Sequence, residues 1–365
     1  MNLEIPVRTS SSRYSAYVGR DILSEALETS LSNHPTDKLF VLIDENVFKH
    51  HWSRIKPVLH STGGTVQHMK IPEGEKSKSL ESYSGMLDFL LNNGVRRNTP
   101  LIVIGGGVTG DVGGFAAATA LRGLPLIHIP TTLLAMVDSS IGGKTGINHE
   151  AGKNLIGAFY QSAAVIADTL FLDTLPEREW INGLSEVLKY GAIKDRKIFG
   201  MAEMFLDQGF KSADVSVLNE LISTCIKIKA EIVEQDEFEG GIRAYLNFGH
   251  TFAHALEKAC HYDTISHGEA VFLGMLAAKK LSELTGSFFT EDYLNKFRSL
   301  YTYRVSKERL SLEELTQFMH SDKKRTGKDI NFVLLEKWQH PVLKAVNDTQ
   351  LIHQAWAVAL DELEP

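Results

Sequence analysis

The sequence predicts an α/β N-terminal nucleotide-binding domain followed by a mainly α-helical C-terminal domain. Over the first half, short apolar runs alternate with helical stretches, which is typical of a mostly parallel sheet. A glycine-rich turn joins one of these strands to a helix. After Leu175-Pro176, helical periodicity dominates to about Leu300. At 365 residues the chain is longer than the chains that usually fold around a single hydrophobic core. We therefore expect two domains, at 1–175 and 176–365.

The expected elements follow from local patterns. Four apolar runs, at 39–44, 100–104, 126–130 and 164–168, have the length and composition of buried parallel strands. Apolar residues at helical spacing predict a helix over 80–91, and an alanine-rich stretch predicts another over 115–120. Near the end, residues 330–335 and 342–346 could form a hairpin. A closing helix is expected over 348–360, beginning at an Asp348 cap.

Composition narrows the functional class. Hydrophobic residues make up 43% and charged residues 23%, which is ordinary for a globular protein, and a net charge of -7 gives no reason to expect a nucleic-acid partner. Cys225 and Cys260 belong to no closely spaced Cys pair or Cys/His cluster, so we interpret them as buried thiols. No signal peptide or membrane span is apparent. We therefore expect a cytoplasmic protein with no membrane partner.

The glycine-rich turn indicates a dinucleotide. Gly105, Gly107 and Gly110 fit the fingerprint in which glycines let the backbone approach a pyrophosphate at a helix N-terminus. The usual layout is not met, because no acidic residue stands ~20 positions after the turn. Asp44, at the end of the first predicted parallel strand, is an alternative candidate for ribose hydroxyls, or else it caps a helix.

Three residues in separate segments could bind a metal ion. Glu186, His250 and His267 supply one carboxylate and two imidazoles, a set that leaves an open position, as catalytic zinc sites do. Such a metal would polarise a bound oxygen. His254 stands four residues after His250 and would share its helix face. That spacing alone is compatible with two interpretations: both histidines bind the metal, or both have a structural role in the helix.

Cations stand in the same segments. Lys189 is three residues after Glu186 on a predicted helix, where it is expected to meet an anion. Lys144 and Lys153 each stand beside a small-residue turn whose backbone amides suit a phosphate or carboxylate, although either turn could be a glycine-rich surface loop. The remaining cations in these segments are Lys229 and Arg243.

An ordered set of motifs runs through most of the chain. These are GGGVTGD at 105–111, PTTLL at 130–134, DSSIGGKT at 138–145, GKN at 152–154, EVLKYG at 186–191, RAYLNFGHT at 243–251, HA at 254–255 and HGEAV at 267–271. Together they resemble the 3-dehydroquinate synthase family, and the resemblance extends from about residue 35 to 335. Phe248 and Ala253 depart from the Leu and Gly of other members, and the tail after Leu335 matches poorly.

The resemblance implies roles for individual residues. It assigns the metal, Zn2+ or Co2+, to Glu186, His250 and His267, which leaves His254 as a catalytic or substrate-binding residue. Catalytic residues are implied at Asp138, Lys144, Asn154, Lys189 and His254. Substrate contacts are implied at Lys153, Lys229, Arg243, Asn247 and one of Lys323 and Lys324, with Arg122 reaching the phosphate from the partner subunit of a homodimer. NAD contacts are implied at Asp44, Asn46, Glu75, Lys78, Gly106, Gly107, Val108, Asp111, Thr131, Thr132, Asp138, Ser139, Thr174 and Leu175.

The implied reaction converts 3-deoxy-D-arabino-heptulosonate 7-phosphate to 3-dehydroquinate and phosphate, a shikimate-pathway step. NAD oxidises one hydroxyl transiently, phosphate is eliminated, hydride returns, and an intramolecular aldol step closes the ring. Competing interpretations are another sugar-phosphate cyclase of the epi-valiolone or deoxy-scyllo-inosose type, and a metal-dependent polyol dehydrogenase that releases NADH. A catalytically silent binding protein is a further class, and the intact polar set argues against it.

Overall fold

The computed structural model describes residues 3–261, 264–323 and 330–363, and the chain divides into two compact units. The first unit comprises Met1–Glu179 and Asp214–Phe238, and the second comprises Trp180–Ala213 and Glu239–Pro365. This division differs from the predicted one at 175/176 because helix α8 (Val215–Gln235) packs on strands of the first unit. Helical periodicity shows that a helix has a buried face, but it does not show which core that face covers.

A sheet of seven described strands forms the centre of the first unit, in the order β1-β2-β9-β6-β5-β3-β4. The first strand is antiparallel to its neighbour, and all other pairs are parallel. The four strands predicted from apolar runs are present, and every residue in the middle of each strand is buried. The bounds are β1 Leu3–Arg8, β2 Arg13–Gly19, β3 Lys38–Asp44, β4 Thr65–Ile71, β5 Leu101–Gly105, β6 Leu126–Pro130 and β9 Ala164–Asp168.

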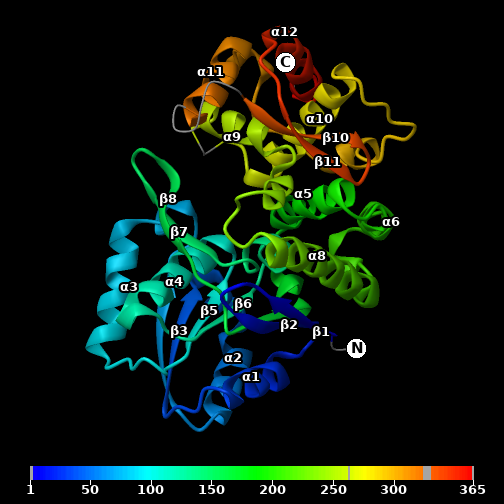
Figure 1. Ribbon diagram of the computed structural model, residues 1–365. Coiled ribbons are helices and arrows are strands. Elements are labelled where there is room, and N and C mark those ends of the chain that lie inside the picture. Colours follow the sequence, from blue (N-terminus) through cyan, green and yellow to red (C-terminus); the bar gives the residue numbers. More distant parts are fainter. Residues whose placement is uncertain (1–2, 262–263, 324–329, 364–365) are drawn as a thin grey trace. The chain divides into compact units, whose positions relative to one another are not determined.

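Helices cover both faces of this sheet (Figure 1). Helices α1 (Leu23–Ser32) and α2 (Glu45–Ser61) lie on one side, and α3 (Leu80–Asn92) and α4 (Gly107–Thr119) lie on the other, as right-handed crossovers require. Adjacent strands β3 and β5 therefore lead into helices on opposite faces. Such a switch point opens a crevice at the carboxyl ends of the strands, where α/β sheets bind ligands.

A second described feature of this unit is the hairpin of β7 (Lys144–His149) and β8 (Gly152–Phe159). The sequence suggested only glycine-rich turns here. Two of the glycines are needed for the pairing itself. A Cβ on Gly146 would lie 2.6 Å from the Ile156 carbonyl oxygen, and one on Gly157 would lie 2.1 Å from the Thr145 carbonyl oxygen. Glycine content therefore marks close strand pairing here rather than an irregular loop.

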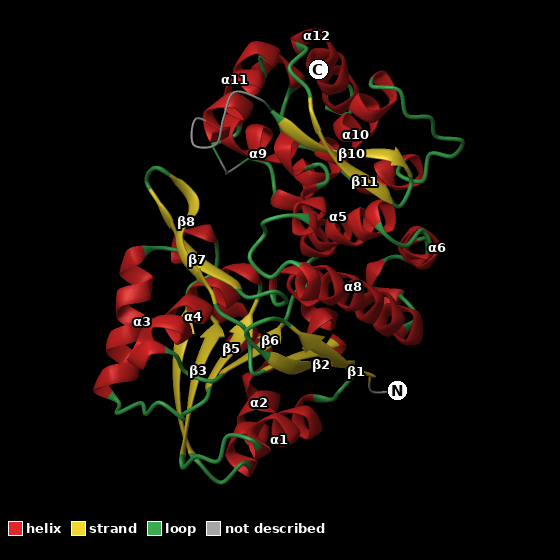
Figure 2. Cartoon of the chain, viewed as in Figure 1, coloured by secondary structure: helices red, strands yellow, loops and turns green. Residues whose placement is uncertain are grey.

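The second unit is mainly helical, with one hairpin among its described residues (Figure 2). Helix α10 is buried along most of its length and packs on α9, α12 and β10. Both late predictions are confirmed: the hairpin forms, and Asp348 caps the closing helix through the Gln350 and Leu351 amides. The bounds are α5 Glu177–Ile193, α6 Lys197–Ala202, α7 Met204–Gln208, α9 His250–Ala259, α10 His267–Leu284, α11 Leu312–Lys323, β10 Asn331–Lys337, β11 His340–Ala345 and α12 Thr349–Leu360.

Short helical turns complete the connections. Among the described residues, no helix combines the length and the apolarity that crossing a membrane demands. The turns that carry predicted site residues are η1 Glu75–Ser77, η2 Ala120–Arg122, η3 Ala135–Ser139, η4 Thr169–Thr174 and η6 Ile242–Asn247, and η7 Asn295–Leu300 lies in the second unit.

Candidate metal, cofactor and substrate sites

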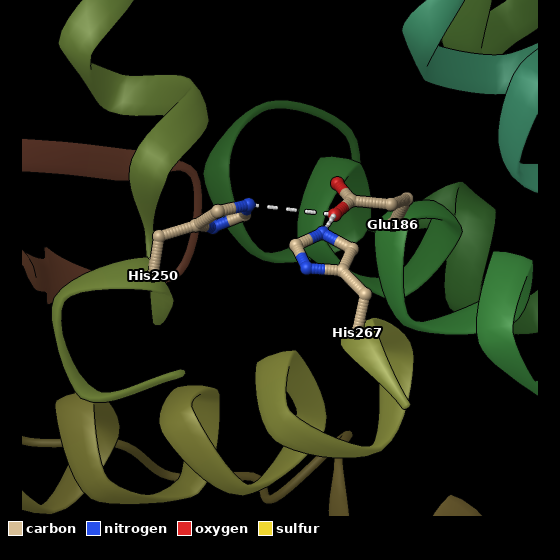
Figure 3. A group of neighbouring side chains, drawn as sticks. All are labelled: Glu186, His250 and His267. Atoms are coloured by element: carbon tan, nitrogen blue, oxygen red, sulfur yellow. Dashed lines mark hydrogen bonds and ion pairs between the residues drawn. The ribbon is translucent and has the colours of Figure 1, made fainter. Parts of the chain in front are cut away.

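Glu186, His250 and His267 converge within the second unit (Figure 3). One ligand atom from each lies within 4.8 Å of the others. The Nε2 atoms of His250 and His267 lie 3.4 and 3.2 Å from Glu186 Oε1. Three different helices, α9, α10 and α5, supply the three side chains, so only the tertiary fold brings them together.

Both imidazoles are oriented through their other ring nitrogen. His250 Nδ1 lies 3.2 Å from the Phe248 carbonyl oxygen, and His267 Nδ1 lies 3.4 Å from Glu257 Oε1. Because these partners accept hydrogen bonds, Nδ1 carries the proton in the neutral ring and the Nε2 lone pair faces Glu186. Metal-binding histidines are held in this way. Glu257 was not predicted, although it stands seven residues after His250 and so shares its face of α9.

Electrostatics favour a positive charge between these three side chains. Burial alone would lower the pKa of His267, but hydrogen bonds to Glu186 and Glu257 outweigh burial and raise the pKa to about 10. Burial likewise works against the Glu186 carboxylate, yet Lys189 and the two histidines hold the pKa of Glu186 well below its usual range. A lone pair on each Nε2 beside a carboxylate is stable only when a proton or metal ion lies between them. The donor set therefore fits a divalent metal with an open position.

Lys189 and His254 lie beside this set. The ammonium of Lys189 forms a buried ion pair with Glu186, which is the anion expected on its helix face. The ring of His254 stands nearly perpendicular to that of His250, with centroids 5.6 Å apart. His254 is exposed and does not belong to the converging group in the described part of the chain. The structure thus groups His250 with residues distant in sequence rather than with its helical neighbour.

The glycine-rich turn lies at the switch point of the first unit. Ile43 pairs with Ile104, so Asp44 and Gly105 stand at the same edge of the sheet. Gly106 is the N-cap of α4, and the first turn of that helix includes Gly107 and Val108. A Cβ on Gly106 would lie 3.0 Å from the Thr132 side chain, and one on Gly107 would lie 3.3 Å from Ser139 Oγ. Glycine at these positions therefore lets Thr132 and Ser139 approach the α4 N-terminus, where backbone amides suit an anion.

Asp44 caps helix α2, accepting hydrogen bonds from the amides of Asn46 and Val47 at 2.9 and 3.2 Å. Of the two roles considered for it, the cap is thus observed. Burial raises the pKa of Asp44, although the cap hydrogen bonds partly oppose this. The side-chain amide of Asn46 donates to Glu73.

Other predicted cofactor residues form specific contacts in this unit. Lys78 Nζ lies 2.5 Å from Asp111 Oδ2, and burial raises the pKa of that carboxyl against the opposing effect of Lys78. Glu75 accepts a hydrogen bond of 2.7 Å from Asn148. The hydroxyl of Thr132 accepts from the Ala135 amide at 3.1 Å. Thr131 and Leu175 are buried, and Thr174 Oγ1 lies 2.7 Å from His51 Nε2.

One predicted substrate-binding residue, Lys229, contacts Asp138 within the first unit. Lys229, on α8, lies 3.0 Å from the carboxylate of Asp138 and donates to its carbonyl oxygen at 2.7 Å. This contact joins α8 to the first unit, together with the packing of α8 on β1 and β2. Lys144, Lys153 and Asn154 lie on the β7–β8 hairpin. Asn154 has a left-handed φ of 56°, which asparagine tolerates better than most residues.

Arg243 and Asn247 lie on η6 of the second unit. Arg243 is 1% exposed, so its guanidinium is part of the interior. Asn247 donates to Glu239 Oε1 at 3.1 Å, and Glu239 has a left-handed φ of 62°. Glu239 was not predicted. The available signal was an acidic residue directly before Gly240 and Gly241.

Three remaining predictions have little structural context. Arg122 is exposed at the end of η2 with φ 68°. Lys323 is the last residue of α11, and its side chain lies outside the described structure. Lys324 also lies outside the described residues.

Comparison with known proteins identifies the family. The region 68–182 matches the family described as 3-dehydroquinate synthase N-terminal, and 183–325 matches 3-dehydroquinate synthase C-terminal. The 3-dehydroquinate synthase of Nitrosospira multiformis is 43% identical over 326 residues, 88% of each chain.

Solved structures of related enzymes share the fold. A 2-deoxy-scyllo-inosose synthase complexed with carbaglucose-6-phosphate, NAD+ and Co2+ superimposes with a TM-score of 0.87 at 25% identity, covering 97% of this chain and 99% of that one. The 2-epi-5-epi-valiolone synthase ValA of Streptomyces hygroscopicus, with NAD+ and Zn2+ bound, has a TM-score of 0.86 at 24% identity and covers 98% and 99%. By its family matches and this identity, the chain belongs to the 3-dehydroquinate synthase family.

Proposed function

We propose that this protein is an NAD- and metal-dependent lyase that converts 3-deoxy-D-arabino-heptulosonate 7-phosphate to 3-dehydroquinate and phosphate. The observation that carries the proposal is the buried Glu186 carboxylate facing the Nε2 atoms of His250 and His267. A relative named for this reaction is 43% identical, whereas the cyclase named for 2-deoxy-scyllo-inosose is 25% identical. We also propose a cytoplasmic location, which suits a biosynthetic enzyme.

Glu186, His250 and His267 would hold the metal. When bound, NAD accepts and returns a hydride while the divalent metal, zinc or cobalt, polarises the substrate oxygen. Because Glu186 is the one carboxylate of this set, its single negative charge would not neutralise a divalent ion held there. Lys189, paired with Glu186 in the interior, would add a second positive charge to the site. His254 is exposed beside His250 and would transfer protons during elimination.

The NAD pyrophosphate would bind at the N-terminus of α4, where the backbone amides of the first turn would donate to it. Asp44 stands across the switch point, where its Oδ1 accepts the cap hydrogen bonds. Its second carboxylate oxygen would accept from a ribose hydroxyl. The other proposed NAD contacts are Asn46, Glu75, Lys78, Gly106, Gly107, Val108, Asp111, Thr131, Thr132, Asp138, Ser139, Thr174 and Leu175.

Cationic side chains would recognise the two anionic ends of the substrate. The proposed substrate contacts are Lys144, Lys153 and Asn154 on the hairpin, Lys229 on α8, and Arg243 and Asn247 on η6. One of Lys323 and Lys324 would add a further contact. Arg122 would reach the phosphate from the partner subunit, so we propose a homodimer. Its exposed side chain on a left-handed backbone supports that role.

The test compares two substrates that differ in the carboxylate. Purified protein is supplied with NAD, zinc and either the heptulosonate phosphate or sedoheptulose 7-phosphate, and phosphate release and carbocycle formation are followed together. We expect turnover of the first and none of the second. Preference for sedoheptulose 7-phosphate would indicate a valiolone-type cyclase instead. Glu186→Gln, which keeps the side-chain shape but removes a ligand charge, is the matched inactive control.

A further inference from the structure

A chain of buried hydrogen bonds joins helix α5 to the first turn of helix α10 in the second unit. Ser185 Oγ donates to the Gly268 carbonyl oxygen at 2.6 Å, and the Tyr301 hydroxyl lies 2.8 Å from Ser185 Oγ. On its other side, Gly268 donates its amide to Asn182 Oδ1 at 2.5 Å. Ser185 is completely buried and Tyr301 is 6% exposed. Both polar groups of Gly268 are thus held by side chains of α5.

The direction of each hydrogen bond follows from counting protons. A carbonyl oxygen can only accept, so the one proton of the Ser185 hydroxyl goes to Gly268. Tyr301 must therefore donate to Ser185. The result is a directed series from Tyr301 through Ser185 to the backbone of α10, and loss of either hydroxyl breaks it.

This series is placed next to two proposed metal ligands. Ser185 directly precedes Glu186, and Gly268 directly follows His267. A serine in a helix interior commonly bonds its own helix three or four residues back. Here Ser185 reaches another helix instead. Close contact is also built in, because a Cβ on Gly268 would lie 2.3 Å from the Asn182 carbonyl oxygen.

Packing fixes Tyr301 in the same position. Its ring stacks on Phe272 of α10, with centroids 3.9 Å apart and an interplanar angle of 10°. Tyr301 follows η7 directly, so its ring touches one ligand-bearing helix while its hydroxyl bonds the other. It can therefore set the separation of α5 and α10, and with it the distance from Glu186 to His267.

We propose that Tyr301 and Ser185 are positioning residues for the metal centre, which hold His267 at the correct distance from Glu186. This inference rests on the proposed metal site. Neither residue supplies a ligand, so the effect of each is expected on metal affinity and geometry. Removal of groups that orient metal ligands typically lowers metal affinity about 10- to 100-fold.

The test uses Tyr301→Phe, which keeps the stacked ring and removes only the hydroxyl. Tyr303→Phe is the matched control, because the Tyr303 hydroxyl is buried without a hydrogen-bond partner among the described residues and its ring lies parallel to that of Tyr301. Metal-free proteins are titrated with zinc against a competing chelator, and the visible spectrum of the cobalt-loaded forms reports ligand geometry. Thermal unfolding without metal verifies that each variant is folded.

We expect Tyr301→Phe and Ser185→Ala to weaken zinc binding about 10- to 100-fold and to alter the cobalt spectrum, with Tyr303→Phe indistinguishable from the unaltered protein. The double variant should be no worse than Ser185→Ala alone, because the two bonds act in series. Equal zinc affinity in Tyr301→Phe, Ser185→Ala and the unaltered protein would overturn the inference while leaving the metal site intact. Failure of the unaltered protein itself to bind zinc would overturn the proposed metal site as well.

Discussion

The crossing of helices α9 and α10 leads to a specific prediction at Gly249, the residue before His250. Gly249 has φ 83°, in the left-handed region, and a Cβ there would lie 2.8 Å from the backbone nitrogen of Met275 on α10. From the other side, a Cβ on Gly274 would lie 2.2 Å from the Gly249 carbonyl oxygen. Glycine is therefore required both by conformation and by contact. We predict that Gly249→Ala destabilises the protein and displaces His250.

The magnitude follows from two separate costs. A left-handed conformation costs a non-glycine residue about 1–2 kcal/mol. Forcing a methyl group against the backbone of a packed helix costs about 1–3 kcal/mol more. The sum is about 2–5 kcal/mol, a large part of the ~5–15 kcal/mol that stabilises a typical domain. For a unit of this size the loss corresponds to roughly 4–20 °C in Tm.

Calorimetry of the metal-free protein measures this loss, and zinc titration of the same samples measures the displacement of His250. Gly200→Ala is the matched control, because Gly200 lies in α6 and a Cβ there would have no neighbour within 4 Å. That variant should gain up to ~1 kcal/mol from helix propensity. Similar Tm values for the two variants would refute the steric reasoning.

Three further predictions concern the metal ligands, the stability of the protein in acid, and substrate binding. His267→Ala should abolish tight zinc binding, whereas His254→Ala should retain it. Metal analysis after dialysis measures the zinc content of both variants, and equal zinc loss in the two would mean that the ligand set is wrong. Burial opposes the Glu237 carboxylate, but hydrogen bonds from Ser10, Ser11 and Gln161 outweigh it and lower the pKa to about 2. Because this folded value lies below the usual 4.5, the stabilisation is complete above pH 4.5 and lost as the pH falls towards 2. The Tm difference between the unaltered protein and Glu237→Gln should therefore shrink over that range, and a difference independent of pH would contradict the assignment. Arg243→Lys should lower kcat/KM about 10- to 100-fold, because the lysine ammonium is a point charge and cannot reproduce the planar fork of the guanidinium. Unchanged kcat/KM in steady-state assays would show that Arg243 does not bind the substrate.

The sequence predicted the sheet interior because parallel strands buried on both faces read as continuous apolar runs. It did not predict the β7–β8 hairpin, whose Gly146 and Gly157 resemble loop residues until the close approach of the strands is known. Nor could periodicity assign α8 to the first unit. The contact between Lys229 and Asp138, one of those that join α8 to the first unit, links residues 91 positions apart.

Prediction of the site had a similar limit. The ligand types of Glu186, His250 and His267 were visible in the sequence, but their convergence depends on three helices packing together. Glu257 and Tyr301 were missed because each acts through a neighbour. Glu257 orients His267, and Tyr301 forms a hydrogen bond with Ser185. Neither contact has a local sequence pattern that would reveal it.

Recycling of NAD within each catalytic cycle distinguishes the proposed lyase from a dehydrogenase. The decisive measurement supplies the heptulosonate phosphate in large excess over NAD, with zinc present, and records dehydroquinate, phosphate and NADH together. We predict many equivalents of dehydroquinate and phosphate per NAD, in equal amounts, with no net NADH. One NADH released for each product molecule, with turnover stopping when NAD is consumed, would contradict the account and indicate a polyol dehydrogenase.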